Sequence, residues 1–225
     1  MNKYRRLFYL AMMLILASCS DQTTYSLDGD WIGYKAVRAF SGDTIQDNFH
    51  LLLTFQGDSL YVRNFKYIRG GDKDSLSIYS YRIQGDSLIS IDQENVYSFE
   101  IIEQARDELV LSTGRTELYY RRLDGTTPKI APVELAKNTY TISRYGEVID
   151  TAKFWDDQTV EMYNRALERP HEAFYYAIKN FAGHDLLVVD SPELPVFMIR
   201  ETGEGIFELK KEPRDTAGFM MQKVR

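Results

Sequence analysis

Hydrophobic and polar residues alternate with a period of two along most of the chain, starting at Trp31. The clearest runs are 49–55 and 97–101, in which every second residue is large and apolar. Such alternation is typical of strands that place one face on a core. Turn residues separate the runs, and Gly-Asp pairs at 57–58 and 85–86 are suited to hairpin turns. The pattern therefore predicts an all-β chain.

The alternating runs fall into two groups of eight. The first group comprises 31–40, 48–56, 59–68, 75–84, 87–93, 96–103, 108–113 and 116–123. The second group comprises 138–145, 148–155, 159–166, 172–180, 185–191, 195–201, 205–211 and 217–224. Between them, 124–134 is a short polar stretch with two prolines and a glycine, which is typical of a linker.

The two groups also repeat each other in sequence. Four segments recur in the same order at nearly constant spacing: 55–60 with 154–160, 81–83 with 176–178, 88–92 with 186–190, and 99–103 with 197–201. Repeated units imply two similar domains, each closing its own core. We therefore expect two tandem antiparallel β-barrels or half-barrels of about eight strands each.

The segment before the strands is a targeting signal. Lys3, Arg5 and Arg6 form a basic region, and 7–17 is an unbroken apolar stretch. That stretch is shorter than the roughly 20 residues needed to span a bilayer, and it has the length of a signal peptide core. It ends in a branched residue and two small residues, directly before the single cysteine of the chain: Leu16, Ala17, Ser18 and Cys19.

These four residues resemble the lipobox of bacterial lipoproteins. The resemblance implies cleavage after Ser18 and acylation of Cys19, which would become the new N-terminus. Several acyl chains anchor a protein stably to a membrane. Ser20 follows the cysteine, and by analogy the absence of Asp there favours the outer membrane. The expected location is the cell envelope, on the periplasmic or the external face.

The charge balance changes with this assignment. The whole chain has a formal net charge of −6, and the segment through Cys19 contributes three basic residues and no acidic ones, so the remainder carries −9. An acidic chain is poorly suited to binding nucleic acid, because phosphate contacts require a basic surface. A single cysteine excludes both an internal disulfide and a zinc site built from cysteines.

The borders of the first group of strands resemble a known family. Gly29, Trp31 and Gly33 open it, and Tyr119-Tyr120-Arg121-Arg122 closes it. This is similar to the short lipocalin-like domains of lipoproteins from Gram-negative bacteria. The resemblance implies that Trp31 plugs the barrel floor and that Arg121 or Arg122 lies over its ring as a cation–π partner. In the second group Tyr140 replaces the tryptophan and Lys223 stands near the arginine position.

We therefore expect a signal peptide over 1–18, a lipidated N-terminus and tether over 19–30, a lipocalin-like domain over 31–123, a linker over 124–134 and a diverged second domain over 135–225. An eight-stranded barrel either encloses a small ligand or fills with side chains. Two functions follow. The first is a non-enzymatic lipoprotein that binds a small apolar or amphipathic ligand, and the second is an accessory subunit of an outer-membrane assembly with filled barrels.

One motif in the sequence suggests an enzyme instead of a binding protein. Gly-Asp-Ser-Leu occurs at 57–60 and again at 85–88, and this block names the GDSL esterases. That family also needs an Asp-x-x-His near the C-terminus and an α/β fold, and neither His171 nor His184 has an aspartate three residues before it. A block that recurs between alternating strands indicates turn chemistry instead. We expect no catalytic residues, no metal site and no cofactor.

Overall fold

The computed structural model describes residues 26–46, 51–68, 71–92, 95–123, 134–164, 172–190 and 196–224. The signal peptide, Cys19 and nearly all of the expected linker lie outside these residues. Within them the secondary structure is strand and turn, as the sequence predicts. None of these ranges contains a helix with the length and apolar character needed to cross a bilayer.

Nine strands form the first sheet. They are β1 (Gly29–Arg38), β2 (Thr44–Gln46), β3 (Leu51–Gln56), β4 (Ser59–Ile68), β5 (Gly71–Gln84), β6 (Ser87–Asp92), β7 (Asn95–Gln104), β8 (Glu108–Ser112) and β9 (Thr116–Arg122). Each strand from β3 onward pairs antiparallel with the next, and β1 pairs with both β3 and β9. This last pairing closes a barrel of eight strands. The short β2 pairs with the far end of β1.

The second sheet closes in the same way. Its strands are β10 (Thr139–Arg144), β11 (Glu147–Phe154), β12 (Thr159–Asn164), β13 (Glu172–Phe181), β14 (His184–Val189), β15 (Phe197–Gly203), β16 (Ile206–Lys210) and β17 (Phe219–Lys223). Pairing between β10 and β17 completes the ring. The predicted all-β fold of two tandem eight-stranded barrels is thus confirmed, and both are closed barrels rather than half-barrels. The up-and-down order of eight strands is that of lipocalin-like barrels.

Each barrel has its own apolar core. Trp31, Phe55 and Leu88 are among the buried residues of the first core, and Tyr140, Phe154 and Leu187 occupy the same register in the second. Each core contains the same edge-to-face ring contact. The ring centroids of Phe55 and Tyr81 are 5.1 Å apart in the first core, and those of Phe154 and Tyr176 are 4.7 Å apart in the second. The cores therefore repeat in structure as well as in sequence.

One of the four sequence matches is shifted by a residue. In the first barrel Leu88 pairs with Phe99. Phe197 is the equivalent of Phe99 in the second barrel, and it pairs with Leu187. Leu88 thus corresponds to Leu187, whereas the sequence aligned it with Leu186. Leu186 points out of its barrel into a third cluster. In an apolar strand both faces look alike in sequence, so alternation could not fix the register there.

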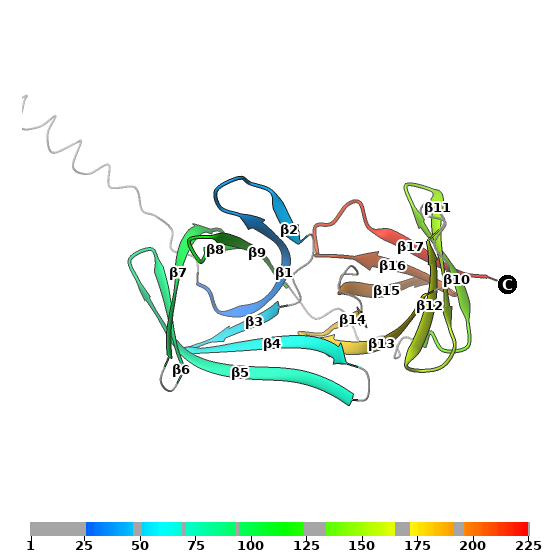
Figure 1. Cartoon of the computed structure of the whole chain (residues 1–225), viewed down its shortest axis with the longest axis horizontal. Helices are drawn as coiled ribbons and strands as arrows, with labels where there is room; N and C mark the ends of the chain where they lie inside the picture. The colour runs from blue at the N-terminus through cyan, green and yellow to red at the C-terminus, as the bar shows by residue number, and fades with distance from the viewer. Residues whose placement is uncertain are drawn as a thin grey trace, which may run out of the picture.

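The third cluster joins the two barrels, which lie side by side (Figure 1). It contains outward-facing residues of both: Ile32, Leu52, Phe65 and Leu123 from the first side, and Phe181, Leu186, Val188 and Val196 from the second. The long β4–β5 hairpin reaches toward the second barrel, and Phe65 on β4 meets Phe181 on β13 edge to face at 6.5 Å. The barrels therefore share an apolar interface.

Candidate ligand site

One end of the first barrel is closed by Trp31. Its side chain is fully buried, and its indole Nε1 donates a hydrogen bond of 2.9 Å to the carbonyl oxygen of Leu27. Arg122 lies over the indole, with 4.8 Å between the guanidinium carbon and the ring centroid. Arg122 also donates to the carbonyl oxygens of Ser26 and Asp28, at 2.6 and 2.5 Å. Residues 26–28 are thereby held across this end.

Arg122, and not Arg121, is therefore the arginine next to Trp31. Arg121 is its neighbour on β9 and points to the outer face of the barrel. There it lies 3.1 Å from Glu108 of the same barrel and 3.2 Å from Glu212 of the second barrel. The sequence left the choice between the two arginines open, because alternation alone does not show which of two adjacent residues at the end of a strand points into the barrel.

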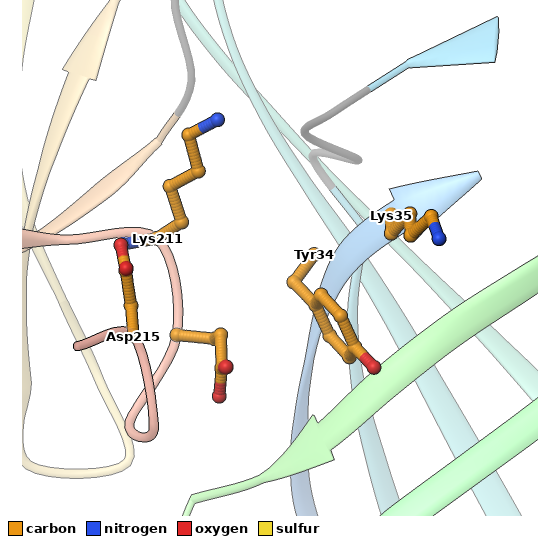
Figure 2. Close-up of a pocket in the computed structure, with 5 residues that line it drawn as sticks. Tyr34, Lys35, Lys211 and Asp215 are labelled. Atoms are coloured by element: carbon orange, nitrogen blue, oxygen red, sulfur yellow. The ribbon is translucent and has the colours of Figure 1, made fainter. Parts of the chain in front are cut away.

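A polar cleft of about 190 Å³ opens beside this ion pair, between the two barrels. Tyr34 and Lys35 on β1 line one side of it, and Lys211, Glu212 and Asp215 on the connection that follows β16 line the other (Figure 2). The Tyr34 hydroxyl donates to Glu108 at 2.7 Å. Burial, together with this hydrogen bond and the charge of Glu108, raises the pKa of Tyr34 well above its usual range, so the hydroxyl remains a donor at neutral pH.

The side chains of this cleft are largely engaged with the protein itself. Asp215 accepts hydrogen bonds from the backbone nitrogens of Lys211 and Ala217, which shapes the loop. Burial lowers the pKa of Arg121, but Glu212 and Glu108 outweigh it and raise the pKa overall, so the guanidinium stays charged. The cleft therefore adjoins an ion-paired seam between the barrels.

The interior of the second barrel is almost completely filled. Its cavity measures about 30 Å³ and is lined by apolar side chains: Ile142, Ala152, Phe154, Val160, Met162, Leu187, Val189, Phe197, Leu209 and Met221. That volume admits one or two water molecules. Sites for small organic ligands measure about 300–1,000 Å³. This barrel is therefore packed as a core.

The pairing register of the strands allows the first barrel to be compared with the second, position by position. Trp31 pairs with Arg122 as Tyr140 pairs with Lys223, which makes Trp31 equivalent to Tyr140. The sequence placed these residues in equivalent positions, and the pairing agrees. Near this closed end the first barrel has the larger side chain, Leu53 in place of Ala152.

At three positions away from Trp31, the first barrel has the smaller side chain. Gly33 takes the place of Ile142, Val62 that of Met162, and Ser90 that of Val189. All three positions in the second barrel line its small cavity. At two other positions the first barrel has the larger side chain, because Leu60 takes the place of Val160 and Tyr120 that of Met221.

The same inner face also carries polar groups. Ser90 is only 3% exposed. Tyr79 and Tyr97 meet edge to face with ring centroids 6.1 Å apart, and each lies on the inward parity of its strand. Asn64 is the next inward residue after Leu60 and Val62 on β4, and its buried Oδ1 accepts no hydrogen bond. A buried acceptor without a donor costs about 1–3 kcal/mol.

These polar residues form the candidate ligand site: Asn64, Tyr79, Ser90 and Tyr97, of which Ser90 is buried and Tyr97 is 45% exposed. Sequence analysis missed it as a site. The signal was present, because each residue occupies a position that its alternating strand directs inward, where an apolar side chain is usual. Only the closed ring shows that the positions from β4, β5, β6 and β7 share one interior.

The two Gly-Asp-Ser-Leu blocks both lie at hairpin turns. Gly57 and Gly85 have φ angles of 61° and 59°, a left-handed conformation that favours glycine, and each glycine precedes the next strand by two residues. Ser59 donates to the adjacent Asp58 at 3.3 Å. Within the described part of the chain, no group of three or more histidine, cysteine or acidic side chains is arranged to hold a metal ion.

No family model matches the chain, and no curated protein matches its sequence. Among the solved structures that are similar to part of it are the following two. One is a protein from Bacteroides eggerthii DSM 20697, with a TM-score of 0.37 and 11% identity, covering 44% of this chain and 100% of its own. The other is a lipocalin-like protein from Bacteroides uniformis ATCC 8492, with a TM-score of 0.37 and 17% identity, covering 43% and 98%. The fold given above rests on the strand pairing within this chain.

Proposed function

We propose that this protein is a non-enzymatic, lipid-anchored protein of the cell envelope whose first barrel binds a small apolar or amphipathic ligand. One observation carries the proposal: at three equivalent inner positions, the first barrel has Gly33, Val62 and Ser90 where the second has Ile142, Met162 and Val189. A core that serves only stability has no need of buried hydroxyl and amide groups. In this proposal the second barrel braces the first.

The anchor is the second part of the proposal. Its support is the order of a basic region, an apolar stretch and Leu16-Ala17-Ser18-Cys19. The described contacts begin at Ser26, because the backbone carbonyls of Ser26 and Asp28 accept hydrogen bonds from Arg122 at the closed end of the first barrel. Fewer than ten residues would therefore separate the acylated cysteine from the barrel, and the closed end would be the end nearer the membrane.

Ligand binding can be tested with an apolar fluorophore. N-phenyl-1-naphthylamine should increase in emission when it is mixed with the chain from Ser20, which contains every described residue. Ser90→Leu should abolish the increase, since it introduces the kind of side chain that fills the second barrel. The matched variant Val189→Leu should leave it unchanged. A signal that survives Ser90→Leu would place the fluorophore elsewhere and would contradict the proposal.

A second function, binding of a partner protein, is favoured by one surface. The outer face of β5, β6 and β7 carries exposed aliphatic side chains, among them Ile78 at 58% and Val96 at 67% exposure. Ile91 pairs with Val96 across the strands, so the residues adjoin. Contiguous exposed apolar surface is typical of interaction sites. Pull-down from membranes should then recover a stoichiometric partner that is lost in Ile78→Asp, whereas a lone chain would argue against this function.

A further inference from the structure

The polar cleft between the two barrels has the charges of a second binding site. We propose that it binds a small dicarboxylate, with one carboxylate paired to Lys35 of the first barrel and the other to Lys211 of the second. The cleft lies on the outer face of β1, outside both barrel interiors. This inference therefore does not rest on ligand binding inside the first barrel.

A β-bulge in β1 turns two consecutive side chains toward the cleft. The pairing register of β1 with β9 shifts between Gly33 and Lys35, so Tyr34 is the extra residue. Side chains of a regular strand alternate between its two faces, whereas a bulge interrupts the alternation and re-aims a side chain. Tyr34 and Lys35 therefore both line the cleft, although they are neighbours in sequence.

The carboxylates on the opposite wall already have partners within the protein. Asp215 accepts hydrogen bonds from two backbone nitrogens of its own loop, at 3.1 and 2.9 Å. Glu212 accepts a hydrogen bond of 2.8 Å from the backbone nitrogen of Arg214 and lies 3.2 Å from the Arg121 guanidinium. These two acids shape the connection after β16, and they do not neutralise the lysines of the cleft.

Lys35 and Lys211 are charged differently from their surroundings. Within the residues that the structure describes, no carboxylate lies within ion-pair distance of either ammonium group. The Lys35 ammonium lies over the Tyr119 ring, 5.2 Å from its centroid, which is a weak contact for a cation. Both lysines are partly buried, and the walls of a cleft reduce the screening of such charges by solvent. Each wall therefore offers one positive charge to a ligand.

The size and shape of the cleft limit the ligand. Its volume of about 190 Å³ is below the range of about 300–1,000 Å³ for drug-sized ligands, so a short molecule fits it. Lys35 and Lys211 lie on opposite walls (Figure 2), so the two negative groups have to be set apart. The Tyr34 ring is held by Arg121, whose guanidinium carbon lies 5.3 Å from the ring centroid. This ring offers an apolar surface to the methylene groups that separate two carboxylates.

Isothermal titration calorimetry of the chain from Ser20 tests the proposal. Succinate, glutarate and adipate would be titrated at pH 7.4, because they differ only in the spacing of their carboxylates. Pentanoate serves as a monocarboxylate and sulfate as a compact dianion. We expect the best of the three dicarboxylates to bind at least tenfold more tightly than either pentanoate or sulfate.

Lysine variants locate the site. Lys35→Gln and Lys211→Gln should each weaken the best dicarboxylate at least fivefold, because each removes one of the two ion pairs. Lys153→Gln removes a lysine of the second barrel that does not line the cleft, and it should keep the affinity. Without ligand all three variants should melt close to the unmodified chain. The dicarboxylate should raise the melting temperature of the unmodified chain and of Lys153→Gln alone.

Three outcomes would overturn the proposal. The first is that none of the dicarboxylates binds. The second is that pentanoate or sulfate binds as tightly as the best dicarboxylate, since two separated negative groups would then not be required. The third is an affinity that survives in Lys35→Gln or in Lys211→Gln. None of these outcomes affects the test of the first barrel with N-phenyl-1-naphthylamine, which uses an uncharged probe.

Discussion

Single residues at the closed end of the first barrel connect the N-terminal tether to the core. Arg122 contacts the Trp31 ring and two carbonyl oxygens of 26–28, so three weak interactions depend on one guanidinium. The resemblance to lipocalin-like domains implied that Trp31 plugs the barrel. It could not choose Arg122, because that choice depends on the pairing register of β1 with β9.

Arg122→Gln should destabilise the first barrel by about 1–3 kcal/mol, through loss of the cation–π contact and of charge-assisted hydrogen bonds. Urea denaturation measures the change, and tryptophan emission should shift to the red as Trp31 gains solvent. Arg82→Gln is the control, since Arg82 is exposed on β5 of the same barrel. Equal stability of the two variants would contradict the assigned role of Arg122.

His184 gives the chain a dependence on pH. Burial, which outweighs the nearby Asp185 and Asp30, lowers the pKa of His184. The unfolded chain therefore takes up the proton first as the pH falls. The stability present above about pH 6.5 should decline as the pH drops through the lowered pKa. Melting temperatures between pH 8 and pH 5 should show this decline, and His184→Gln should flatten it. An unchanged slope in that variant would show that His184 is not responsible.

At the scale of strands and turns, alternation predicted most of the observed elements. It placed β4 at its observed bounds, because polar turns flank an unambiguous period of two. It missed β2, which lies between the predicted strands 31–40 and 48–56. It gave no reason for Ile32, Leu52 and Phe65 to be buried on the outer faces of their strands. Those residues are buried because a second barrel covers them, and that contact is not encoded in any local pattern.

The turns provide an element-scale prediction. Gly57→Ala and Gly85→Ala should each cost about 1 kcal/mol, because alanine is strained at their positive φ angles. Ser59→Ala and Ser87→Ala should change stability by no more than about 0.5 kcal/mol. Thermal denaturation compares the four variants. Ester hydrolysis by the unmodified chain that disappears in either serine variant would revive the esterase interpretation.

For the whole molecule, the seam between the barrels determines whether they behave as one unit. Arg121 lies within ion-pair distance of Glu108 and Glu212, and Arg214 of the second barrel pairs with Asp107 of the first. The apolar cluster around Phe65 and Phe181 lies in the same interface. We therefore expect the two barrels to unfold together.

Arg121→Ala should separate their unfolding. It leaves Glu108 and Glu212 without their shared partner, at a cost of about 3 kcal/mol. Calorimetry should show one transition for the unmodified chain and two for the variant. Arg200→Ala breaks an exposed ion pair within the second barrel and should keep a single transition. Two transitions in the unmodified chain would mean that the seam does not couple the barrels.

The central claim is that the first barrel holds a ligand and the second does not. Native mass spectrometry of the chain from Ser20, mixed with a lipid extract of a bacterial envelope, tests it most directly. The account predicts one added ligand mass per chain, absent in Ser90→Leu and retained in Val189→Leu. A chain that stays unliganded throughout, or an adduct that persists in Ser90→Leu and disappears in Val189→Leu, would contradict it.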